Sequence, residues 1–104
     1  MLVAFSVAPQ GSGDSVAEAV ARAVTVVRDS GLPNRTDAMF TTLEGEWEEC
    51  LDVVRRACEA AGEGATRVSL VLKADIRPGR TGELDAKVER LERAIQGQAE
   101  GQAS

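Results

Sequence analysis

The chain has 104 residues, 43% of them hydrophobic, which is enough for one domain with a single core. Its 17 acidic residues outnumber its 12 basic ones, and the net charge of −5 argues against nucleic acid as a partner. No apolar run approaches the ~20 residues that span a bilayer, and the N-terminal run lacks signal-peptide features, so we expect a cytoplasmic protein without a membrane partner.

Residues 2–7 alternate in polarity and predict a strand, which the Gly- and Pro-containing residues 8–13 should end. Ser15 and Glu18 form the ends of a capping box and predict the start of a helix. The apolar residues behind this box recur at helical spacing and predict the buried face of that helix: Val16, Val20, Ala23, Val24 and Val27.

Two short strands are predicted at residues 34–37 and 40–44, joined as a hairpin. A second helix should begin near Gly45 and Glu46, because three glutamates lie where a helix favours negative charge. Its predicted core face is Trp47, Cys50, Leu51, Val54, Ala57 and Ala61.

Residues 68–76 form the strongest predicted strand, and residues 77–80 should turn the chain. Thr81 is the predicted cap of a third helix, whose apolar face is Leu84, Val88, Leu91 and Ile95. Residues 96–104 lack such a pattern. We therefore expect one domain over residues 1–95 and a mobile C-terminal tail over residues 96–104.

The predicted order is β-α-β-β-α-β followed by a C-terminal helix. This order is typical of the α+β ferredoxin-like sandwich, an antiparallel sheet of strand order 4-1-3-2 with two helices on one face. The other face of the sheet is left open.

Strand alternation assigns residues to the two faces of the sheet. The residues expected to face the helices are Val3, Phe5, Val7, Leu43, Val68, Leu70 and Leu72. Those expected on the open face are Leu2, Ala4, Ser6, Phe40, Thr42, Glu44, Ser69, Val71 and Lys73. Because the open face is partly apolar, we expect a partner sheet to cover it.

Glu44 and Lys73 are the two charges of this open face. The expected strand order places them at one end of the sheet with one strand between them, which leaves a gap of ~10 Å. Either a salt bridge closes this gap, or a small polar ring binds in it between the two charges.

The chain has no histidine, so Ser-His-Asp and Cys-His catalysis and histidine-ligated zinc are excluded. Cys50 and Cys58 fall on one predicted helix with Cα atoms ~12 Å apart, too far for a disulfide. We predict that both are small buried apolar side chains, and we predict no catalytic residue and no metal site.

Several motifs resemble a known family in their order and spacing. They are Phe5-Ser6-Val7-x-Pro9 with Gly11 and Ser15, then Ser30-Gly31-Leu32, then Thr41-x-x-Glu44-Gly45-x-Trp47-x-Glu49, and last Lys87-Val88-Glu89. Across residues 2–95 the chain resembles the small ferredoxin-like thiamine-binding proteins, relatives of the YkoF proteins that bind thiamine and hydroxymethylpyrimidine.

The resemblance implies a non-enzymatic protein that binds thiamine or its hydroxymethylpyrimidine, requires no cofactor, and forms dimers or tetramers through its sheets. Ser6, Thr41 and Glu44 are the ligand contacts that it implies. Alternation turns Thr41 toward the helices, so Thr42 is the substitute contact, and Lys73 completes the expected site. Trp47 would add a cation–π contact if it reaches the ligand.

Three other functions stay open. One is an RNA-binding module, which would use Phe5 and Phe40, although alternation places them on opposite faces. Another is a small enzyme with Glu44 as general base and Lys73 as acid or Schiff-base amine. The third is a structural or regulatory homo-oligomer without a small ligand.

Overall fold

The structure is a computed structural model that describes residues 1–11, 13, 15–79 and 81–103. Parts of the predicted loop at 8–13, turn at 77–80 and tail at 96–104 therefore lie outside the described residues. The elements are β1 (Leu2–Gln10), α1 (Val16–Asp29), β2 (Asn34–Thr36), β3 (Thr41–Glu44), α2 (Trp47–Ala61), β4 (Arg67–Asp75) and α3 (Glu83–Ala103). The four strands pair antiparallel in the order β2-β3-β1-β4, which confirms the predicted ferredoxin-like sheet.

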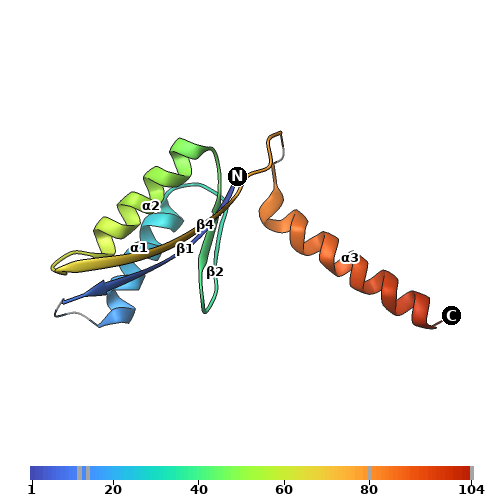
Figure 1. The fold of residues 1–104 in the computed structure, drawn as a ribbon, viewed down its shortest axis with the longest axis horizontal. Coiled ribbons are helices and arrows are strands. Elements are labelled where there is room, and N and C mark those ends of the chain that lie inside the picture. The colour runs from blue at the N-terminus through green and yellow to red at the C-terminus, as the bar shows by residue number, and fades with distance from the viewer. Residues whose placement is uncertain (12, 14, 80, 104) are drawn as a thin grey trace.

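Helices α1 and α2 lie together on one face of the sheet, and α3 projects away from this body (Figure 1). The core forms between the two helices and the sheet. Its buried members are Val3, Phe5, Ala23, Val27, Leu43, Cys50, Val53, Val54, Ala57 and Ala61. The small side chains of α1 and α2 let the two helices approach each other closely.

The strand register confirms the predicted faces. Val3 pairs with Leu43 and Ala74, and these three residues project toward the helices. Leu2 pairs with Glu44 and Asp75, which project to the open side. β1 runs to Gln10 instead of ending at residue 7, because β4 pairs with it along its whole length.

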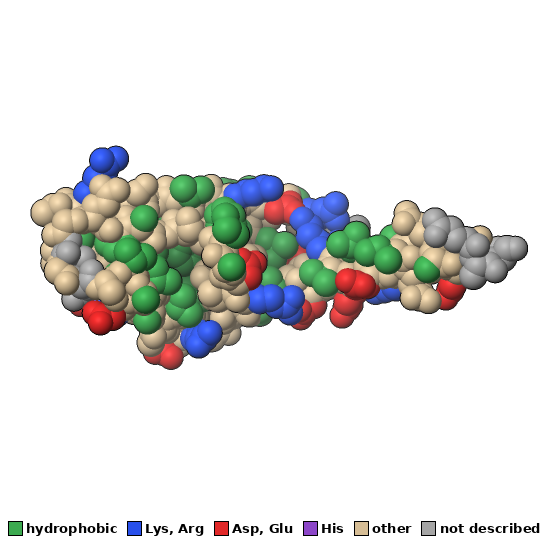
Figure 2. Space-filling model, turned by 90° about the horizontal axis from the view of Figure 1, so that it is seen from below, with side chains coloured by type: hydrophobic (Ala, Val, Ile, Leu, Met, Phe, Trp, Pro, Cys, Tyr) green, Lys and Arg blue, Asp and Glu red, His purple; other side chains and the backbone are tan. Residues whose placement is uncertain are grey.

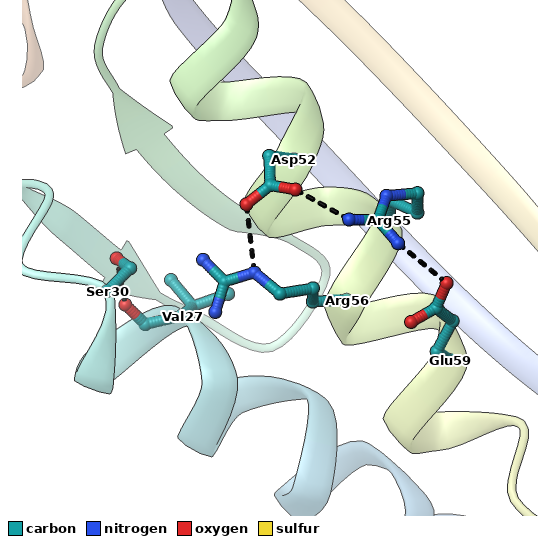
Figure 3. Close-up of polar contacts among 6 residues, drawn as sticks. All are labelled: Val27, Ser30, Asp52, Arg55, Arg56 and Glu59. Atoms are coloured by element: carbon teal, nitrogen blue, oxygen red, sulfur yellow. Dashed lines mark hydrogen bonds and ion pairs between the residues drawn. The ribbon is translucent and has the colours of Figure 1, made fainter.

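Helix α1 begins where the capping box predicts, with the Ser15 hydroxyl accepting from the Glu18 amide at 3.2 Å. Its buried residues are Ala19, Ala23 and Val27, whereas Val16 is exposed. The buried face of α1 therefore includes Ala19, which the predicted face lacks, and excludes Val16, which the predicted face contains. At the other end the Ser30 hydroxyl donates to the Val27 carbonyl at 2.5 Å (Figure 3).

Helix α2 begins at Trp47, and the Glu49 side chain accepts from the Glu46 amide at 3.0 Å. Cys50, Val54, Ala57 and Ala61 are buried as predicted, and Val53 joins them. The predicted burial of Trp47 and Leu51 is wrong, since these side chains are 49% and 41% exposed.

The solvent face of α2 carries ion pairs one helical turn apart (Figure 3). Arg55 donates to Asp52 at 2.7 Å and to Glu59 at 2.9 Å, and Arg56 donates to Asp52 at 3.0 Å. The two guanidinium groups lower the pKa of Asp52. Exposed pairs of this kind are screened by solvent and contribute little to the stability of the helix.

Helix α3 continues to Ala103, so the expected end of regular structure near Ile95 is wrong. The helix holds Val88, Leu91 and Ile95 in the predicted row, but all three are largely exposed. The division of the chain at residue 95 stays a prediction.

Candidate functional site

The predicted site residues separate into two groups, one on each face of the sheet. Ser6, Thr42, Glu44 and Lys73 project to the open face, as the register with β1 requires. Thr41 pairs with Phe5, is buried, and projects toward the helices. The expected cluster on the open face therefore does not form as one site in this structure.

Glu44 and Lys73 do not face each other across β1. Glu44 lies opposite Leu2, whose other neighbour is Asp75, whereas Lys73 lies two residues further along, opposite Ala4. Among the described residues no ion pair joins Glu44 to Lys73. The expected pairing is wrong because the register brings a second carboxylate, Asp75, to the level of Glu44.

Helix α3 fills the expected gap beside Glu44. One Glu44 carboxylate oxygen accepts from the Glu83 amide at 2.9 Å, and the other accepts from the Leu84 amide at 3.4 Å. The predicted cap, Thr81, precedes this turn, and the first helical bond runs from the Ala86 amide to the Gly82 carbonyl. A carboxylate from β3 thus caps the positive end of α3.

Little space is left directly beside Glu44, although a more open pocket of about 340 Å³ lies next to it between Thr42 and α3. The cavity beside Glu44 measures about 10 Å³, room for one water molecule. Lys87 of α3 forms an ion pair with Asp75 there. Glu83 is also buried and accepts from Arg90 at 2.8 Å. A ligand ring would have to displace α3 to reach Glu44.

A larger cavity of about 200 Å³ lies at the opposite end of β3, and we call it the hairpin groove. It is bounded by α1, the middle of β1 and the turn between β2 and β3. Its lining is Phe5, Ser6, Val7, Val20, Ala23, Val24, Thr36, Asp37, Ala38, Met39, Phe40 and Thr41. Two residues of the predicted site, Ser6 and Thr41, line this groove, although their side chains project to opposite faces of the sheet. Hydrophobic side chains gather on the underside of the body in Figure 2.

The groove exists because β1 is longer than β3. β1 pairs with β4 from Leu2 to Gln10, but it pairs with β3 only from Leu2 to Phe5. In the described part of the chain no strand pairs with this edge of β1 beyond Phe5. Backbone amides and carbonyls there can therefore serve a bound molecule.

Polar groups lie at defined places around the groove. The hydroxyls of Thr36 and Thr41 are 3.1 Å apart and share a hydrogen bond. At the mouth, Asp37 accepts from the amides of Met39 at 2.8 Å and Phe40 at 2.9 Å. These two amides lower the pKa of Asp37, and the Phe40 amide has the larger effect. This exposed carboxylate therefore stays charged at neutral pH. Asp37 was not singled out in the sequence, although its place in the turn before Thr41 was visible.

The cysteines are free thiols. Cys50 is buried and Cys58 is half-buried, and burial raises the pKa of both thiols. Raised pKa values disfavour the thiolate that a nucleophile needs. Across the described residues no cluster of acidic or cysteine side chains is arranged to hold a metal ion, and no helix has the length and apolar character to cross a membrane.

A family described as thiamine-binding protein matches residues 3–92. A UPF0045 protein of Mycobacterium bovis is 56% identical over 96 residues, which cover 91% of this chain and 94% of the relative.

Two solved structures share the fold. A hypothetical protein from Methanocaldococcus jannaschii has a TM-score of 0.78 at 30% identity, covering 88% of this chain and 94% of the other. A Thermotoga maritima protein, described as a candidate for thiamine biosynthesis or salvage, has a TM-score of 0.70 at 27% identity, covering 85% and 96%. The chain belongs to the thiamine-binding protein family.

Proposed function

We propose that this protein binds thiamine, or its hydroxymethylpyrimidine moiety, in the hairpin groove and does not transform it. One observation carries the choice of site. Ser6 and Thr41 belong to two motifs 35 positions apart, and both line a single cavity. Drug-sized ligands occupy ~300–1,000 Å³, so a groove of about 200 Å³ suits one ring better than a whole larger ligand.

The groove has the chemistry that an aminopyrimidine needs. This ring presents a hydrogen-bond donor beside an acceptor, and the hydroxyl of Thr41 can both donate and accept. The unpaired edge of β1 adds an amide and a carbonyl beside Ser6. Phe5 and Phe40 supply apolar surface against which a flat ring can pack.

The charged part of thiamine fits the mouth of the groove. The thiazolium ring is a cation, and the exposed carboxylate of Asp37 lies where a second ring would leave the cavity. The protein carries a net charge of −5, which favours a cationic ligand further. Among the described residues no lysine or arginine lines the groove, so a phosphate would find no cationic partner among them.

A ligand role for Glu44, Thr42 and Lys73 stays a prediction of the sequence. The carboxylate oxygens of Glu44 already accept from two amides of α3. Fewer lone pairs are then left to accept a proton from a substrate, so Glu44 is poorly suited to act as a general base. Lys73 lies level with Thr42 instead of Glu44, so these two charges do not form an acid–base pair. For this reason we favour binding over catalysis.

We further propose that the protein is a homo-oligomer, a dimer or tetramer, in which sheets meet through their open faces. Val71 lies on that face and is 56% exposed, with the small side chains of Ala4, Ser6 and Ala8 beside it on β1. Such a face is suited to packing against a second flat surface. A homo-oligomer without a ligand is the alternative if the groove binds nothing.

Calorimetric titration with thiamine and with hydroxymethylpyrimidine tests the proposal. Thr41→Val should weaken binding about 3- to 10-fold, because it removes one hydroxyl hydrogen bond worth about 0.5–1.5 kcal/mol. Ser69→Ala removes a hydroxyl from the open face, outside the groove, and should leave the affinity unchanged.

Two results would contradict the proposal in different ways. Absence of heat and of any thermal shift with both compounds at millimolar concentration would reject the ligand. Weakened binding in Glu44→Gln or Ser6→Ala, with normal binding in Thr41→Val, would move the ligand to the open face.

A further inference from the structure

A further cavity lies at the end of the sheet where β3 and β4 finish, and we call it the Trp47 cavity. It measures about 230 Å³ and is separate from the hairpin groove, which lies at the other end of β3. Its lining is Met1, Gly45, Glu46, Trp47, Ile76, Arg77, Pro78 and Gly79. None of the residues named lines the hairpin groove, so the proposed ligand site does not account for this cavity.

The strand register explains why this cavity exists. β3 ends at Glu44 and β4 ends at Asp75, and both residues pair with Leu2 of β1. The chain therefore leaves the sheet twice at the same level, once toward α2 and once toward α3. Figure 1 shows the connection to α3 starting beside the N-terminus. The two connections form the walls of the cavity, and the Met1 carbonyl accepts from the Gly45 amide at 3.1 Å between them.

Each wall of the Trp47 cavity presents a large apolar side chain. Trp47 begins α2 and is 49% exposed, and Ile76 follows β4 and is 48% exposed. Pro78 and Gly79 continue the second wall, and Gly79 has a φ of +75°. Proline followed by a glycine of positive φ is typical of a type II turn, which restrains the backbone of this wall. An apolar group can therefore enter against surfaces that are already in place.

The lining also contains two charged side chains of opposite sign, Glu46 on the α2 wall and Arg77 on the β4 wall. Neither side chain forms an ion pair with another described residue. The Glu46 amide donates to the Glu49 carboxylate at 3.0 Å, which holds Glu46 at the start of α2. The cavity thus offers one cation, one anion and an apolar surface to the same small molecule.

We propose that the Trp47 cavity binds a free amino acid with an aromatic or branched apolar side chain. The carboxylate of the ligand pairs with the Arg77 guanidinium, and its ammonium group pairs with the Glu46 carboxylate. The side chain of the ligand packs against Trp47 and Ile76. The volume of about 230 Å³ equals that of roughly seven water molecules at ~30 Å³ each, which suits one small molecule.

The charges of the cavity favour a free amino acid over other ligands. Both of its charges are attached to one carbon atom, next to the apolar side chain. The end of a peptide chain carries only one of the two charges, so either Glu46 or Arg77 would stay unpaired. A ring that carries a phosphate would bring its negative charge close to Glu46, and the net charge of −5 on the protein disfavours such a ligand further.

Trp47 is the single tryptophan of the chain, so its fluorescence measures binding to the unmodified protein. Titration with phenylalanine and with leucine should change Trp47 emission in a saturable way. Phenylalaninamide lacks the carboxylate, and phenylpropionate lacks the ammonium group. Each should bind wild type about tenfold more weakly than phenylalanine, because each loses one hydrogen bond between charged groups.

Variants assign each charge of the ligand to its partner. Arg77→Gln should weaken phenylalanine binding about tenfold and leave phenylalaninamide binding unchanged, because the amide has no charge for Arg77 to bind. Glu46→Gln should weaken phenylalanine binding in the same way and leave phenylpropionate binding unchanged. Arg67→Gln and Glu48→Gln remove the same charges outside the cavity and should bind phenylalanine as wild type does.

Three results would overturn the proposal. The first is unchanged Trp47 emission, with no heat of binding, for both amino acids at millimolar concentration. The second is equal binding of phenylalanine, phenylalaninamide and phenylpropionate by wild type, because the two charges would then play no part. The third is equal weakening in Arg77→Gln and Arg67→Gln. The two measurements on wild type need no variant, so they decide the matter even if a substitution impairs folding.

Discussion

The carboxylate of Glu44 and the amide of Glu83 form a buried hydrogen bond of 2.9 Å between residues 39 positions apart. Through this bond the last residue of β3 fixes the point at which α3 leaves the sheet. A carboxylate at a helix N-terminus satisfies free amides and also interacts favourably with the helix dipole. The Thr41-x-x-Glu44-Gly45 motif therefore has a structural role in addition to any ligand role.

Glu44→Ala should lower the free energy of unfolding by about 1–2 kcal/mol, because two amides of α3 lose their acceptor. Glu44→Gln keeps one carbonyl oxygen and should cost less than Glu44→Ala. Urea denaturation followed by circular dichroism measures both. Glu48→Gln, at an exposed carboxylate in the first turn of α2, is the control. Equal stability of wild type and Glu44→Ala would show that the cap contributes nothing.

The faces of the sheet could be predicted from sequence, whereas the Glu44 cap could not. Alternation has a period of two, so placing Val3 and Phe5 in the core decides the side of every neighbouring residue. A cap is usually sought in the residues just before a helix, and Thr81 is the natural choice there. The acceptor comes instead from a strand that the fold brings to the same point.

Val71→Glu should dissociate oligomers that form through the open sheet face. Val71 is 56% exposed in the protomer, so the substitution should leave the monomer folded and act through the interface, where a charge would be buried without a partner. Sedimentation velocity measures the effect. Val16→Glu, at a 64% exposed position on α1, should not alter the assembly. An unchanged sedimentation coefficient for Val71→Glu would exclude this face.

Truncation after Ile95 should leave the melting temperature nearly unchanged. The structure extends α3 to Ala103, but every described side chain beyond Ile95 is exposed, so little packing is lost. A fall of more than about 4 °C, or ~1 kcal/mol for a domain of this size, would show that these residues pack against something. Truncation after Gly82 removes the amides that bind Glu44 and should be clearly destabilising.

The hairpin groove depends on strand lengths that the sequence did not reveal. Residues 8–13 contain Pro9 and Gly11, which predict the end of a strand near Val7. Pairing with β4 overrides these local signals and carries β1 on to Gln10. The part of β1 that extends beyond its pairing with β3 then forms a wall of the groove. The pairing of β1 with β4 outweighs the local turn propensity of Pro9 and Gly11, and the groove exists because β1 is extended by this pairing.

Thiamine should bind more tightly than thiamine diphosphate, by about tenfold or more. The part of the chain that the structure describes places no cationic side chain in the groove to bind a phosphate, and Asp37 at its mouth would repel one. Backbone amides lower the pKa of Asp37 from its ordinary value of 3.8, so its charge is present above that range and is lost only as the pH falls through the lowered value. Between about pH 5 and 8 the preference contributed by Asp37 should therefore stay constant.

Asp37→Asn isolates this effect. Asparagine keeps the side-chain oxygen that accepts from Met39 and Phe40, so the turn should survive while the charge is lost. The variant should bind thiamine more weakly than wild type does and should bind thiamine diphosphate no less tightly. The difference in affinity between the two compounds should therefore become smaller. Asp29→Asn changes the same charge at the end of α1, outside the groove, and should leave the ratio of affinities as in wild type. A diphosphate that binds wild type as tightly as thiamine would show that a cation from elsewhere, such as a second copy, reaches the mouth of the groove.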